Sequence, residues 1–289
     1  MAGGALNSDR LDTFPKLLLE NARVRGNRPA NREKDLGIWL TWTWEEVAEE
    51  VRALACGLKN LGVEPEDKVS ICGDNRPHLY WAISAVQAIG ATPVPLYQDS
   101  VADEMQYIYE HAEAKYAIVE DQEQVDKILE IKSKLPNLKH IIYEDARGML
   151  HYEEEFLHDY ATIQNDGRLY DTANPQYYKK SVDRGRGEDV AIILYTSGTT
   201  GRPKGVMLSY DNLIISAANV NAREHLDENE EVLAYLSMAW IGDNMFSFAQ
   251  AYVAGFCVCC PESGETVLDD LREIGPTFFF APPRIFESI

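Results

Sequence analysis

Residues 195–206 read YTSGTTGRPKGV, a run of hydroxyl-bearing residues and glycines that ends in a lone lysine. Glycines let backbone amides approach an anion closely, hydroxyls donate hydrogen bonds, and a lysine adds a compact positive charge. These residue types in this order predict a loop that binds a phosphate group. The candidate binding residues are Thr196, Ser197, Gly198, Thr199, Thr200, Gly201 and Lys204.

The residues on either side of this loop predict how it is held. The apolar stretch 191–194 predicts a strand that runs into the loop, and residues 209–224 predict a helix after it, with Ser209 as the N-cap. The spacing differs from the P-loop of nucleoside triphosphatases, in which Ser or Thr follows the lysine, because Gly205 follows Lys204 here. We expect Lys204 in a Pro-Lys-Gly turn. A Ser/Thr/Gly-rich surface turn is the alternative interpretation, and the residues alone assign no particular reaction.

Strands and helices alternate along the first half of the chain. Apolar periodicity predicts helices at 44–61, 76–89, 101–112 and 122–134, and strands at 68–72, 91–96, 116–119 and 140–143. Pro93 and Pro95 place one of these strands at a sheet margin, because proline donates no hydrogen bond to a neighbouring strand. The alternation predicts an α/β fold in which a parallel sheet is flanked by helices.

The second half of the chain divides into a polar part and a more regular part. Residues 153–187 are polar and weakly periodic, so we interpret them as a connecting region with one helix around 151–160. We expect residues 1–187 to form a first α/β subdomain with this connecting region, and 188–289 to begin a second subdomain that carries the loop. The predicted later elements are strands at 232–236, 256–260 and 277–281, and helices at 244–254 and 267–274.

Composition excludes some classes of partner. The 289 residues include 27 Lys plus Arg against 47 Asp plus Glu, a net charge of −20 that repels nucleic acid and anionic lipid. The chain has no signal-peptide pattern and no apolar run near the ~18–20 residues that cross a bilayer. We therefore expect a cytoplasmic protein with no nucleic-acid partner. Peripheral membrane contact and oligomer formation stay open.

The cysteines allow two interpretations. Five occur, an odd number without regular spacing, which is typical of a reducing compartment. Cys257 and Cys260 have the spacing of a metal or redox motif, but they lie in the apolar run AYVAGFCVCCP without a second such pair. We favour a buried strand, interpret the acidic run 153–155 as a solvated helix face, and predict no metal-ligating residue.

The loop sequence closely resembles the phosphate-loop signature of the adenylate-forming (AMP-binding) superfamily. The resemblance extends along the chain: residues 97–145 are similar to bacterial long-chain fatty-acid–CoA ligases, and PTFFFAPPRIFESI at 276–289 resembles an element of the same branch. It implies stacked parallel-type sheets flanked by helices, as in the N-terminal large domain of the acyl-CoA synthetase (ANL) fold, and this domain is incomplete here.

The resemblance also implies a two-step reaction. A fatty-acid carboxylate attacks the α-phosphorus of ATP to give acyl-adenylate and pyrophosphate, and the thiol of coenzyme A then displaces AMP. In this reaction the loop would bind the β- and γ-phosphates of ATP, with Thr196 and Lys204 stabilising the leaving pyrophosphate and Mg²⁺ bridging the phosphates. Trp240 occupies the position next to the acyl carboxylate in relatives. A core tryptophan is the alternative for Trp240.

The resemblance implies further segments that the sequence does not contain. Relatives continue with a Tyr-Gly-x-Thr-Glu segment, a ribose-binding aspartate, a hinge and a C-terminal domain with a second lysine. We therefore expect these 289 residues alone to bind nucleotide weakly and to catalyse neither step, with apolar surface at 277–281 left uncovered. A non-catalytic nucleotide- or partner-binding homologue is one alternative. An enzyme that acts on aryl, short-chain or bile-acid-like carboxylates is another.

Overall fold

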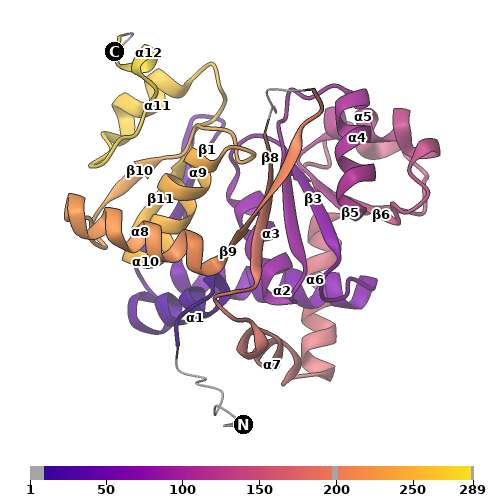
Figure 1. The fold of residues 1–289 in the computed structure, drawn as a ribbon, viewed down its shortest axis with the longest axis horizontal. Helices are drawn as coiled ribbons and strands as arrows, with labels where there is room; N and C mark the ends of the chain where they lie inside the picture. Colours follow the sequence, from indigo (N-terminus) through magenta and orange to yellow (C-terminus); the bar gives the residue numbers. More distant parts are fainter. Residues whose placement is uncertain (1–9, 197–200, 288–289) are drawn as a thin grey trace.

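The computed structural model describes residues 10–196 and 201–287, and these form two larger β-sheets, a two-stranded hairpin, and helices between and outside the larger sheets (Figure 1). The larger sheet is wholly parallel, with strand order β4-β3-β5-β6-β7. Its strands are β3 (Lys68–Cys72), β4 (Thr92–Leu96), β5 (Ala114–Val119), β6 (His140–Tyr143) and β7 (Leu157–Asp159). The parallel sheet predicted from the alternation is confirmed, and the proline-containing β4 lies at its margin.

The second sheet joins the two ends of the sequence. Its strand order is β10-β11-β1-β2, in which β1 runs parallel to β11 and antiparallel to β2. These strands are β1 (Pro29–Asp35), β2 (Ile38–Thr43), β10 (Glu231–Leu233) and β11 (Cys257–Cys260). This sheet therefore takes strands from both sides of residue 187. The division into two subdomains at that residue stays a prediction.

Helices on both sides of each of the two larger sheets produce five layers. Helices α2 (Trp44–Leu61) and α3 (Pro77–Ala88) fill the space between the sheets, while α4 (Ala102–Ala112) and α5 (Gln122–Ile131) cover the outer face of the larger sheet. Helix α11 (Val267–Ile274) covers the outer face of the smaller sheet. Alternate residues of one strand face opposite layers. The confirmed fold is α/β, with helices flanking both sheets.

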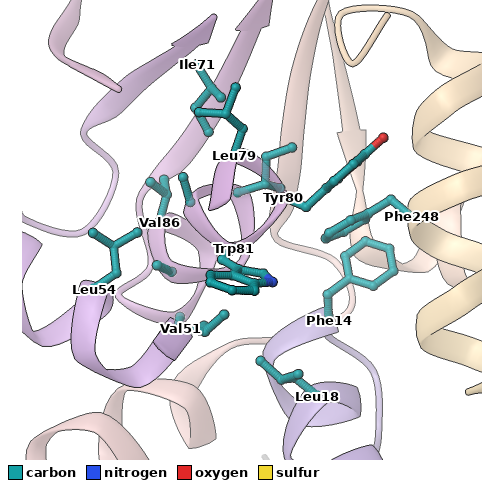
Figure 2. Packing of buried hydrophobic residues seen from close by; sticks show 14 of the residues in the cluster. Phe14, Leu18, Val51, Leu54, Ile71, Leu79, Tyr80, Trp81, Val86 and Phe248 are labelled. Carbon is teal, nitrogen blue, oxygen red and sulfur yellow. The ribbon is translucent and has the colours of Figure 1, made fainter. Parts of the chain in front are cut away.

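The central core is rich in aromatic residues (Figure 2). Trp81 of α3 is 1 % exposed and lies among aliphatic side chains of α2, which include Val51 and Leu54. Phe14, in α1 (Phe14–Arg25), packs edge-on against Phe248 at a ring-centroid distance of 4.9 Å. Burying large side chains of this kind contributes about 1.5–3 kcal/mol each to folding. The first helix of the chain is thereby fixed to a segment more than 200 residues away.

Several element boundaries agree with the sequence patterns. Helix α2 spans Trp44–Leu61 as predicted, because the Thr43 side chain and Glu46 form a capping box at its start. Helix α8 (Tyr210–Glu224) begins after Ser209, whose hydroxyl accepts a hydrogen bond from the Asn212 amide. The 122–134 helix is shorter than predicted, since η1 (Lys132–Lys134) is a 3₁₀ turn.

The interpretation of residues 153–187 as a connecting region is wrong. They contain β7 and two helices, α6 (Tyr160–Ala173) and α7 (Tyr177–Arg184), while 149–151 is only a 3₁₀ turn, η2. Helix α6 packs closely on α2 because Gly57 and Gly167 lie at the contact. A Cβ atom on Gly167 would overlap the Ala53 carbonyl oxygen. Glycine has no side chain, so these two residues do not contribute to the apolar periodicity of the sequence. That periodicity therefore does not predict the contact between α6 and α2. The acidic run 153–155 is exposed but lies outside a helix.

The predicted strand at 277–281 is also absent from the described structure. Thr277 donates its amide to the Glu231 carbonyl oxygen at 3.0 Å, and its hydroxyl accepts from the Glu231 amide. The phenylalanines that follow contact other aromatic rings: Phe279 stacks on Tyr235, and Phe280 stacks on Phe246. These rings are therefore half-buried instead of uncovered.

Candidate functional site

The predicted phosphate loop connects two antiparallel strands. Strand β8 (Val190–Thr196) enters the loop, and β9 (Lys204–Ser209) leaves it and pairs back along β8. The expectation that Lys204 lies in a Pro-Lys-Gly turn is wrong, because Lys204 is the first residue of a strand. Helix α8 begins only after Ser209, at the other end of the hairpin, so its N-terminus lies away from the loop. The local β8–β9 pairing replaces the strand–loop–helix arrangement.

The hairpin brings the two candidate catalytic residues together. Thr196 and Lys204 are directly opposite each other in the last pair of the ladder, and both side chains are exposed. Opposite residues of an antiparallel pair point to the same face. Gly201 has φ of +128°, a conformation that side-chain-bearing residues rarely adopt. Ser197, Gly198, Thr199 and Thr200, the other candidates, lie outside the described residues. A hydroxyl and an ammonium group therefore share one exposed face.

Trp240 lies in a separate segment, between β10 and a short run of irregular helix. It precedes α9 (Ile241–Asp243) and η3 (Asn244–Ala249), a π-helix that continues into α10 (Gln250–Ala254). The indole is 37 % exposed and lies 6.4 Å from the ring of Phe280. It also lies over Gly242, where any Cβ atom would overlap the ring. This exposure makes Trp240 accessible to a ligand and disfavours the alternative of a core tryptophan.

A buried carboxyl anchors the Trp240 segment to helix α3 and to the connection between β3 and α3. Asp243 is 1 % exposed and accepts hydrogen bonds from the Tyr80 hydroxyl at 2.8 and 2.9 Å. Asn75 donates to Asp243 at 3.3 Å and to the Leu236 carbonyl oxygen at 2.9 Å. Burial raises the pKa of the Asp243 carboxyl to about 7, although these hydrogen bonds lower it. The side chain is therefore neutral in the folded protein below neutral pH.

The raised pKa predicts a pH-dependent difference between the wild type and Asp243→Asn. Unfolding lets the carboxyl ionise above about pH 4, so its stabilising contribution is full below that pH and is lost as pH rises to about 7. The asparagine has no such dependence. From pH 5 to pH 8 the wild type should lose on the order of 2 kcal/mol relative to the variant. Urea unfolding of both proteins at both pH values measures this, and a constant difference would contradict it.

A glutamate side chain occupies the usual ligand-binding position of the larger sheet. Ligands of open α/β sheets bind where neighbouring connections leave in opposite directions, here at the carboxyl ends of β3 and β5. Glu120 occupies this place: its carboxylate accepts from the Asp74 amide at 2.6 Å and from Arg76 Nε at 2.8 Å. An internal carboxylate thus fills the position that a ligand would take. The hairpin loop remains the candidate anion site.

The cysteines of the described part of the chain lie in the core. All five cysteines are free and buried, and Cys257, Cys259 and Cys260 lie in or next to an apolar layer, as predicted. Within residues 10–196 and 201–287, no three His, Cys, Asp or Glu side chains gather so as to hold a metal ion. No helix among these residues is long and apolar enough to span a membrane. His78 is half-buried, because Trp81 and Tyr160 pack around it.

Comparison with known sequences decides the family. The sequence model of the AMP-binding enzymes matches residues 18–289. The chain belongs to this family. Its relatives include a long-chain-fatty-acid–CoA ligase, ACSBG2, of Xenopus laevis, which is 32 % identical over 96 % of this chain and 38 % of that protein. FadD15 of Mycobacterium bovis, another long-chain-fatty-acid–CoA ligase, is 29 % identical over 88 % of this chain and 40 % of that protein. This AMP-binding chain thus spans about two-fifths of the length of these relatives.

Solved structures share the fold of this AMP-binding chain. The anthranilate CoA ligase AuaEII, in complex with anthranoyl-AMP, superposes with a TM-score of 0.80 at 22 % identity, covering 93 % of this chain and 49 % of that one. A long-chain-fatty-acid-CoA ligase, FadD1 of Archaeoglobus fulgidus, gives a TM-score of 0.78 at 19 % identity, covering 96 % and 53 %. The adenylate-forming fold expected from the resemblance is confirmed. The chain corresponds to its N-terminal portion.

Proposed function

We propose that this chain supplies the ATP-phosphate-binding part of an enzyme that activates long-chain fatty acids as acyl-adenylates and transfers them to coenzyme A. The placement of Thr196 opposite Lys204 on one exposed face of a hairpin supports the phosphate-binding role. The names of the sequence relatives support the fatty-acid substrate. The resemblance of the loop to the family signature supports assigning the phosphate-binding role and the fatty-acid substrate to one reaction.

The chemistry assigned to the loop follows from charge. When a carboxylate oxygen bonds to the α-phosphorus of ATP, the bond from that phosphorus to the pyrophosphate oxygen breaks and negative charge gathers on the leaving group. The ammonium group of Lys204 and the hydroxyl of Thr196 would stabilise this charge, because such donors are already in place before the reaction. Trp240 would line the acyl side. The described residues contain no cluster of metal ligands.

We propose further that the 289 residues alone bind nucleotide without turnover. The Tyr-Gly-x-Thr-Glu segment, which the family resemblance assigns to adenine and metal binding, does not occur in this sequence. Carboxylate-dependent exchange of labelled pyrophosphate into ATP tests the point with palmitate, benzoate and acetate as parallel substrates. Exchange by this chain would overturn the proposed lack of turnover, and a preference for benzoate or acetate would overturn the long-chain assignment.

Replacing Lys204 by glutamine should weaken pyrophosphate binding by roughly tenfold, because a hydrogen bond to a charged group contributes about 1.5–3 kcal/mol. Titration calorimetry with pyrophosphate measures the affinity of each variant. Lys179→Gln is the matched control, since Lys179 is an exposed lysine that pairs with the neighbouring Asp183 in α7. Equal affinities for the wild type and the Lys204 variant would rule out the proposed role of this lysine.

A further inference from the structure

Two aromatic side chains of α4 contact the hairpin next to the phosphate loop. Tyr107 donates its hydroxyl hydrogen to the carbonyl oxygen of Pro203 at 3.0 Å. One turn further on, His111 Nδ1 lies 2.7 Å from the hydroxyl oxygen of Tyr195. Tyr195 lies in β8 next to the start of the loop, and Pro203 is the last residue before β9. One face of a single helix is therefore bonded to both ends of the loop, which we call its stems.

Ring contacts join these hydrogen bonds into a continuous stack. The guanidinium of Arg202 lies over the Tyr107 ring, 5.2 Å from its centroid, and the Tyr107 ring lies 5.5 Å from that of His111. The His111 ring meets Tyr195 edge-on at 5.7 Å. The stack therefore begins and ends at residues of the hairpin, and two side chains of α4 lie between them. Cation–π and edge-to-face ring contacts of this kind are attractive.

The stack crosses a hollow between α4 and the hairpin. A groove of about 610 Å³ lies there, lined in part by Tyr107, Tyr195 and Arg202. Strand β8 is buried in the core along β4, but the last pair of the hairpin among the described residues, Thr196 and Lys204, is exposed. Exposed strand ends open more readily than buried strand centres. The end that carries both candidate catalytic residues therefore needs support from outside.

We propose that Tyr107 and His111 are positioning residues for the phosphate loop and act through Pro203 and Tyr195. By holding the two stems at one separation, they keep the Lys204 ammonium and the Thr196 hydroxyl in place before phosphate arrives. Donors that are fixed in advance stabilise developing charge without the cost of reorganisation. The ligand in this proposal rests on the proposed function, whereas the support of the stems rests on the contacts alone.

The test is Tyr107→Phe, which keeps the ring over Arg202 and removes only the bond to Pro203. Losing one neutral hydrogen bond should raise amide hydrogen exchange in the peptide 201–209 by roughly fivefold and weaken pyrophosphate binding by a similar factor. The melting temperature should stay within about 2 °C of the wild type. Exchange mass spectrometry and calorimetry on the same samples measure both effects.

Tyr109→Phe is the matched control on the same helix. The Tyr109 hydroxyl faces the sheet and accepts a hydrogen bond from Ser70, so its loss should lower the melting temperature without a local effect on 201–209. Exchange and affinity unchanged in Tyr107→Phe would overturn the proposal. A uniform rise in exchange in both variants would also overturn it, because Tyr107 would then be merely structural. Faster local exchange without pyrophosphate binding in any variant would uphold the support of the stems and reject the proposed function.

Discussion

Replacing Arg76 by alanine is expected to lower the free energy of unfolding by about 3–5 kcal/mol. The guanidinium donates to Glu120 at 2.8 Å and to the carbonyl oxygens of Pro261 and Glu262 at 2.9 and 3.0 Å. It also lies 3.6 Å from the Glu33 carboxylate. These partners come from both sheets, so the variant disconnects the carboxyl ends of β5 and β11 and leaves two carboxylates without their cation.

The loss should grow with pH. Burial already raises the pKa of Glu33 to about 7, even with Arg76 lowering it. Without the cation, the Glu33 carboxyl of the variant would bind its proton still more tightly in the folded state. The stability that this proton gives to the variant is lost as pH rises. Urea unfolding at pH 5 and pH 8 measures both values.

Two further variants calibrate the Arg76 result. Arg76→Lys keeps the charge but loses the forked geometry, so an intermediate loss is expected and foldable protein is available even if the alanine variant fails to fold. Arg147→Ala removes an exposed partner of Asp145 nearby and should cost less than about 1 kcal/mol. A comparable loss at Arg76 and Arg147 would show that the connection between the sheets contributes little to stability.

Replacing Gly167 by alanine should lower the free energy of unfolding by about 3 kcal/mol, even though alanine is the better helix former. In an exposed helix interior the same change stabilises by about 1 kcal/mol. Here the new methyl group would overlap the Ala53 carbonyl oxygen and the Gly57 amide, so α6 must move off α2. The sign of the change therefore separates helix propensity from packing.

Urea unfolding of three single variants and one double variant tests this contact. Gly264→Ala is the control, because no atom lies within 4 Å of the added methyl group, and its effect should stay within about 0.5 kcal/mol. In Gly57→Ala the methyl group would meet the backbone of Ile163 in the same contact. The double variant should lose less than the sum of the single losses, since one separation of the helices relieves both overlaps. A stabilised Gly167→Ala protein would contradict the close approach.

The predicted part of the candidate site is its chemistry, and the unpredicted part is its geometry. Residue types and order identified Thr196 and Lys204, which the hairpin places side by side. The sequence patterns did not predict strand β9, because its start, Lys204–Gly205, resembles a turn. Nor did they identify Tyr107 and His111 as contacts of the loop. Their spacing of four residues on a predicted helix marks a common face, which was the available signal.

The sequence by itself determined the elements whose signals are local. The capping box of α2, the alternation of helices with strands and the phosphate-loop signature all depend on residues within a few positions of one another. The tertiary structure alone decided the polar strand β1. Its Arg32 and Lys34 pair with Glu231 and Asp270, each about 200 residues or more away. A charged strand can be buried only when distant partners neutralise it, and no local pattern contains those partners.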